Sequence, residues 1–307
     1  MKKEEFFRPS SDGVTQLHGY TWTPDGEVRA VLQLVHGMVE YIDRYDAFAS
    51  YLAERGIACI GHDHLGHGQS VTDEGKLGHF ADENGEKYVI DDMHRITEDA
   101  KKRFPGKKVF ILGHSMGSFL LRKYITLYSN EIDGAIIMGT GYIPAALAAT
   151  GKTLSRLTRN IKGKYHRSKL LTSLALGSNN KPFEPARTPN DWLSRNKENV
   201  DKYQADPLCG YMFTTSSYVA FFTVIESLAK HEGFENIRKD LPILVTSGEE
   251  DPVGGRDACP SVLREFKDLG LTDASMKLYP QDRHEILNEV DRDKVYADIE
   301  AWLNARI

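Results

Sequence analysis

The sequence predicts an α/β fold with a mostly parallel central sheet flanked by helices and with a helical cap inserted into it. Two observations support this class. Six short apolar runs are continuous rather than alternating, which is typical of strands covered on both faces. Segments with apolar residues at helical spacing lie between these runs, so strand and helix alternate along the chain.

The first predicted element is an antiparallel hairpin over residues 5–22 that turns at "SSDG" and joins the sheet at its edge. The predicted strands that follow are 28–35, 57–63, 108–113, 134–139, 243–248 and 275–280. The predicted helices have apolar faces formed by Tyr45, Phe48 and Leu52; Val89, Met93 and Ile96; Leu120, Tyr124 and Leu127; and Val295, Ile299 and Leu303.

The alternation stops between residues 142 and 239, where helix-like and loop segments appear without a convincing buried strand. Strands resume at "LPILVTSG", so we interpret residues 142–239 as a cap inserted into one domain. The whole chain, 1–307, is then a single domain with a core formed by 1–141 and 240–307.

Composition excludes several classes. The chain has 40% hydrophobic and 27% charged residues and a net charge of -5, values typical of a globular protein and unlike a general nucleic-acid binder. We find neither a signal-peptide core nor an apolar run long enough for a membrane span, and therefore expect a soluble, cytoplasmic protein. Cys59, Cys209 and Cys259 are widely separated, which indicates plain thiols rather than disulfides or a metal site.

The stretch "VFILGHSMGSFLL" places Ser115 between two glycines, directly after an apolar run and before a helical pattern. This G-x-S-x-G arrangement predicts a sharp strand-to-helix turn that exposes a nucleophilic hydroxyl. The glycines fit because such a turn strains the backbone and crowds its neighbours. The start of the helix also supplies N–H groups for a developing oxyanion.

A serine nucleophile needs a base, and the base needs an acid. His284 follows the last strand in "YPQDRHEILNE" and is the predicted base, whereas His166 and His231 fall in the cap. Asp251 in "SGEEDPV" is the predicted acid, because neighbouring glutamates in such a loop are usually solvated. For the oxyanion hole we predict the backbone N–H groups of Met38 in "VHGMVE" and of Met116.

Five motifs in this order, "VHGMVE", "GHDHLGHGQS", "GHSMGS", "GEEDPV" and "RHE", closely resemble the monoglyceride lipase and lysophospholipase branch of the α/β-hydrolase fold. The resemblance covers residues 28–141 and 241–307. It implies a Ser-Asp-His hydrolase acting on single-chain acyl esters, with Glu40 and Arg44 holding a glycerol head. The chain departs from the family pattern at positions that bear on head-group selectivity: Val39, Tyr41, Ser118 and Leu287.

Other motifs do not predict a cofactor or a metal. His62, Asp63, His64 and His67 in "GHDHLGHGQS" could form a metal site, but the resemblance assigns this segment to a loop beside the active site. "GTGYIP" lacks the third glycine of a dinucleotide fingerprint, and no acidic residue follows at the required distance. We therefore expect neither a nicotinamide cofactor nor a metal.

Three functions remain open at this point. The leading one is a cofactor-free serine hydrolase for esters of monoacyl lipids, with Tyr211 and Phe213 of "GYMFTTSSYVAFF" as candidate acyl-binding residues. An aminopeptidase-like amide hydrolase would need a cap carboxylate for the substrate amine, and the candidates are Glu184, Asp191 and Glu198. A non-catalytic binding protein would have no need of a complete triad.

A basic stretch begins the cap, with Lys152, Arg156, Arg159, Lys162, Lys164, Arg167 and Lys169. If it is helical, Leu154, Leu157 and Ile161 share one face that we expect to pack inward, which leaves the basic residues outside. The outer face is then either solvated or in transient contact with an anionic membrane surface.

Overall fold

The computed structural model describes residues 1–307 and contains one eight-stranded sheet with the order β1-β2-β4-β3-β5-β6-β7-β8. β1 and β2 form the predicted antiparallel hairpin, β2 pairs antiparallel with β4, and all other pairs are parallel. The six predicted apolar strands are confirmed to within two residues. The strands are β1 (Lys2–Pro9), β2 (Gln16–Thr23), β3 (Ala30–Val35), β4 (Ile57–His62), β5 (Lys108–His114), β6 (Gly134–Met138), β7 (Ile243–Gly248) and β8 (Ala274–Tyr279).

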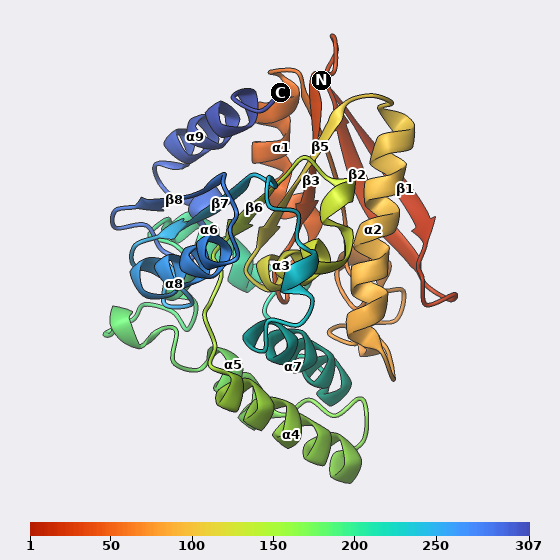
Figure 1. Ribbon diagram of the computed structural model, residues 1–307. Helices are drawn as coiled ribbons and strands as arrows, with labels where there is room; N and C mark the ends of the chain where they lie inside the picture. Colours follow the sequence, from red (N-terminus) through yellow and green to blue (C-terminus); the bar gives the residue numbers. More distant parts are fainter.

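Helices cover both faces of this sheet (Figure 1), because neighbouring residues of a strand point to opposite sides. In β5, Phe110 and Leu112 pack in one cluster with α1 and α9, whereas Ile111 packs in another with α3 and α8. The helices are α1 (Asp46–Ala53), α2 (Gly85–Arg103), α3 (Met116–Tyr128), α4 (Ala145–Lys162), α5 (Lys169–Leu176), α6 (Lys197–Ala205), α7 (Thr215–Ala229), α8 (Gly255–Asp268) and α9 (Arg292–Asn304).

Two features of the core helices differ from the sequence expectation. Leu127 was expected on the apolar face of α3, but its side chain is 54% exposed, and Leu121 and Ile125 are buried instead. α8 was not among the expected helices, although Val262 and Phe266 stand at helical spacing and are buried against the sheet. The spacing of these two residues could therefore have predicted α8 from the sequence.

Helices α4–α7 lie between β6 and β7, in the segment that we interpret as the cap. α4 packs closely on α7, and the residues it buries are the small Ala148, Gly151 and Ser155. A Cβ on Gly151 would lie 2.6 Å from the Phe222 ring, so only a glycine permits this approach. The inward face expected for α4 is therefore wrong for Leu157 and Ile161, whereas Leu154 is partly buried against the core. Leu157 and Ile161 are 54% and 76% exposed, because the small side chains allow the closer contact with α7.

None of the helices combines the length and the apolar composition that crossing a bilayer requires. The limits 142 and 239 of the cap stay predictions.

Candidate active site

Ser115 lies at the turn between β5 and α3 in a strained conformation, with φ 53° and ψ -119°. Steric contacts explain why both residues that flank this turn are glycines. A Cβ on Gly113 would lie 2.4 Å from the Gly117 carbonyl oxygen, and a Cβ on Gly117 would lie 2.3 Å from the Val35 carbonyl oxygen. The end of β3 and the start of α3 are thus in backbone contact, and this contact holds the serine at the edge of the sheet.

Asp251 and His284 follow β7 and β8, and the structure brings them together. His284 Nδ1 lies 3.0 Å from Asp251 Oδ1. Asp251 also accepts hydrogen bonds from the Ser247 hydroxyl and the Val253 N–H. Burial alone would raise the pKa of Asp251, but His284 and these hydrogen bonds outweigh burial and lower it. The carboxylate stays charged and holds the imidazole in one orientation.

His284 and Ser115 line one small cavity of about 30 Å³. Their side chains do not hydrogen-bond to each other in this structure, a contact that often tightens only when substrate is bound. Residues of the helical segment that the sequence did not single out close this cavity: Leu176, Trp192, Leu193 and Tyr203. The Trp192 and His284 ring centroids are 4.9 Å apart. Apolar residues in "NDWL" were the only sequence signal for this cover.

The loop after β3 approaches Ser115 closely, since a Cβ on Gly37 would lie 3.1 Å from the Ser115 Cβ. The Gly37 N–H donates to Glu40 Oε1, and the Val39 N–H donates to His67 Nε2. Met38 stands between these two anchored positions and lines the cavity with Ser115. Met116 begins α3, where backbone N–H groups have no partner within the helix.

Glu40 and Arg44, which the resemblance assigns to a glycerol head, are found in a buried ion-pair cluster. Arg44 donates to Glu40 Oε2 at 2.6 Å and to both carboxylate oxygens of Glu285, at 2.8 and 2.7 Å. Burial would lower the pKa of Arg44, but Glu285 and Glu40 raise it. Glu40 also accepts from Tyr45 and contacts His114, whose Nε2 lies 3.2 Å from the His284 carbonyl oxygen.

This cluster separates two cavities. Glu40 and Glu285 line the cavity beside Ser115, whereas Arg44 lines an adjoining polar cavity of about 900 Å³. Tyr203 lines both. Glu285 directly follows His284 in the sequence, but nothing in the residue pattern indicated its partner.

Tyr211 and Phe213 do not line the cavity beside Ser115. Phe213 is fully buried against Phe80 and Tyr218, and the Tyr211 hydroxyl donates to the Gly66 carbonyl. Their proposed contact with an acyl chain stays a prediction.

Histidines of "GHDHLGHGQS" contact the loop after β3, which includes His36. His36 Nδ1 contacts the Gly37 carbonyl, and its Nε2 accepts the N–H of His64. Both ring nitrogens of His62 and of His64 are buried without partners. Burial lowers the pKa of His62 and of His67 to about 3, so these rings are neutral around pH 7.

Fold and site together define an α/β-hydrolase of the serine type. The chain belongs to the family described as serine aminopeptidase, S33, whose sequence model matches residues 26–291. It is similar to the monoacylglycerol lipase of Mycolicibacterium smegmatis, at 27% identity over 92% of this chain and 90% of the relative. It is similar also to the human monoglyceride lipase, at 25% identity over 93% of this chain and 86% of the relative.

Among solved structures, a thermostable carboxyl esterase from Bacillus coagulans in complex with glycerol superimposes with a TM-score of 0.91 at 26% identity. The match covers 100% of this chain and 99% of that structure. The chain is therefore a serine hydrolase of the lipase and esterase group.

The neutral histidines generate a prediction about acid stability. The unfolded chain binds a proton on His62 below its ordinary pKa of 6.5, whereas the folded chain does so only near pH 3. The stability that His62 contributes is complete above pH 6.5 and is lost as the pH falls toward 3. The free energy of unfolding of His62→Leu should depend less on pH, by up to about 1.4 kcal/mol per pH unit in this window.

Urea unfolding at pH 8, 6, 5 and 4 measures the difference. His166→Gln, at an exposed histidine, is the control and should follow the wild type. Parallel curves for His62→Leu and the wild type would contradict the assignment of a neutral buried ring.

Proposed function

We propose that the protein hydrolyses carboxylic esters of monoacyl lipids, monoglycerides or lysophospholipids, through Ser115, His284 and Asp251. The observation that carries this proposal is the Asp251–His284 contact beside a serine on a strained strand-to-helix turn. The names of the relatives, monoacylglycerol lipase and monoglyceride lipase, support the substrate class.

In the proposed mechanism, His284 Nε2 takes the proton of the Ser115 hydroxyl while Oγ attacks the ester carbonyl carbon. The oxyanion is stabilised by the N–H groups of Met38 and Met116. His284 then gives the proton to the leaving alcohol, and an acyl-enzyme remains. Water, activated by His284 in the same way, releases the fatty acid and regenerates Ser115.

An ester is favoured over a substrate with a free amine because no unpaired carboxylate faces the cavity. Glu184 and Glu198 are exposed, and Asp191 accepts hydrogen bonds from Thr188 and from the Arg187 N–H. None of these three lines the cavity beside Ser115. Glu40 and Glu285 do line it, but both are already paired with Arg44. A strained serine next to a buried Asp–His pair also has no use in a purely binding protein.

The two cavities suggest where the parts of the substrate go. A volume of about 30 Å³ holds roughly one water molecule, so an acyl chain enters only when the cover formed by Leu176, Trp192 and Leu193 moves. The adjoining polar cavity is reached past Tyr203 and Arg44. We infer that the leaving alcohol departs on this polar side.

The triad assignment predicts that His284→Ala lowers kcat by about three decades or more, because base and nucleophile act as a unit. His231→Ala, at an exposed histidine, should leave kcat near the wild-type value. Kinetics with a soluble p-nitrophenyl ester measure both. A fluorophosphonate should label the wild type and fail to label Ser115→Ala; a wild type that resists labelling would refute the serine mechanism.

The substrate class is tested with monoglycerides, lysophospholipids and amino-acid anilides in parallel. We expect kcat/KM for monoacyl esters to exceed that for anilides and to rise with chain length by up to about 0.8 kcal/mol per methylene until the site is full. Faster cleavage of the anilides would favour the amide hydrolase, and rates indifferent to chain length would remove the acyl site.

The structure changes which surface of the helical segment we propose for contact with lipid. Part of the basic stretch is already engaged in ion pairs, because Lys152, Arg159 and Lys164 pair with acidic residues of this chain. Instead, α4 and α5, which lie remote from both termini (Figure 1), have exposed apolar side chains. The exposed residues are Leu147, Leu157, Ile161, Leu170 and Leu174. We propose that this apolar face of α4 and α5 meets the lipid–water interface that carries the substrate.

Accordingly, Leu157→Glu/Ile161→Glu should lose binding to vesicles, since each buried side chain contributes about 1.5–3 kcal/mol. Leu127→Glu, at an exposed leucine of α3, is the matched control and should bind as the wild type does. Cosedimentation with neutral and with anionic vesicles measures both variants. Undiminished binding of the double variant would eliminate this face, and loss in Arg156→Glu alone would restore the basic one.

A further inference from the structure

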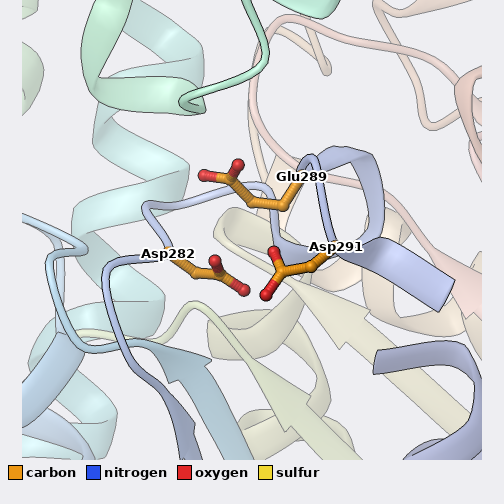
Figure 2. A group of neighbouring side chains, drawn as sticks. All are labelled: Asp282, Glu289 and Asp291. Carbon is orange, nitrogen blue, oxygen red and sulfur yellow. The ribbon is translucent and has the colours of Figure 1, made fainter. Parts of the chain in front are cut away.

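The segment that carries His284 concentrates buried negative charge. Asp282 and Glu289 are buried, and Asp291 is exposed beside them. Figure 2 shows these three side chains grouped together, with the carboxylates of Asp282 and Asp291 turned toward each other. One oxygen atom of each of the three lies within 4.8 Å of the others. Like charges at this separation repel, so the arrangement needs a compensating cation.

That cation comes from the helical segment between β6 and β7. Arg195 Nη2 donates to Asp282 and also to Asp291 Oδ1, at 2.7 Å from the latter. Its Nε lies 3.4 Å from Glu289 Oε2, and its backbone N–H donates to Glu289 Oε1 at 2.9 Å. One guanidinium therefore faces three carboxylates.

Residues 191–196 of the helical segment also lie alongside the loop that carries His284. The Glu285 N–H donates to the Leu193 carbonyl at 2.7 Å, and the Arg283 guanidinium donates to the Asp191 carbonyl at 2.5 Å. The Trp192 ring packs on the His284 ring. Residues 191–196 thus contact the base from one side.

On the other side of His284, Asp282 contacts the loop that carries Asp251. Its backbone carbonyl accepts the N–H of Glu250, the residue before Asp251. Asp282 therefore connects the loop of the predicted acid with the loop of the predicted base, and Arg195 holds it from outside the core.

We propose that Arg195 is a positioning residue for His284, a role that rests on the proposed function. Arg195 reduces the repulsion among the carboxylates of Asp282, Glu289 and Asp291 and so keeps His284 at the right place relative to Ser115 and Asp251. Without Arg195 the three carboxylates repel one another and the loop shifts. A shift of about 1 Å at a reacting group can cost two decades in rate.

This role has a pH signature. Burial, followed by Glu289 and Asp291, raises the pKa of Asp282 to about 7, while Arg195 opposes the rise. Loss of Arg195 therefore raises the pKa of Asp282 further. Below that pKa the neutral Asp282 relieves the repulsion, and above it the repulsion is complete. The deficit of a variant relative to the wild type should then grow from pH 6 to pH 9.

The experiment compares Arg195→Met with Arg195→Lys and with Arg195→Met/Asp282→Asn. Arg187→Met is the matched control, because Arg187 lies in the same helical segment and pairs only with Asp191 and Asp201 within it. For each protein, kcat and KM for a soluble p-nitrophenyl ester are measured from pH 6 to pH 9, together with thermal unfolding.

We expect Arg195→Met to lose about 10- to 100-fold in kcat at pH 8, with KM within about twofold and a smaller loss at pH 6. The lysine variant should recover part of kcat. The double variant should recover part as well, since it removes the charge conflict. Arg187→Met should match the wild type.

Wild-type kcat in Arg195→Met would overturn the proposal, as would a loss that is the same at every pH and is not relieved in the double variant. If Arg195→Met does not fold, the lysine and double variants decide between these outcomes. An inactive wild type that a fluorophosphonate does not label would instead refute the proposed function, so the two failures are distinguishable.

Discussion

The backbone contact between the start of α3 and the end of β3 is the constraint on which the site depends. Because Gly117 lies against the Val35 carbonyl, the chain turns sharply enough to hold Ser115 at positive φ. The same contact brings the loop after β3 beside the serine, so that Met38 and Ser115 share one cavity. Ser115 and the loop that carries Met38 are thus placed by one packing requirement at the carboxyl edge of a parallel sheet.

Beside this turn the protein buries several carboxylates, and two arginines pair with them. Arg44, which lies just before α1, pairs with Glu40 and Glu285; Arg195, from the helical segment, pairs with Asp282, Glu289 and Asp291. Of these carboxylates, Asp282 and Glu285 stand on either side of His284 in the sequence. A buried ion pair is sensitive to the loss of one partner, so these contacts couple the position of the base to elements outside its own loop.

The helical segment between β6 and β7 then has two distinct sides. Its inner side closes the cavity with Trp192, Leu193 and Tyr203, whereas α4 and α5 turn leucines toward solvent. The choice of inner face in α4 follows from size: Gly151 allows Phe222 of α7 to approach more closely than a leucine would. The same segment therefore both covers the cavity and contacts His284.

The sequence by itself determined the sheet and the turn at Ser115, and it predicted that Asp251 and His284 come together, because each of these depends on local apolar runs and on the order of motifs along the chain. The tertiary structure decided what lies between distant segments: the pairing of Arg44 with Glu285, the contact of Arg195 with Asp282, and the outward face of α4. Local periodicity cannot show which of two helix faces fits a neighbour, since that depends on the shape of the neighbour. Nor can it pair charges that lie far apart in the sequence, since only folding brings them within reach of one another.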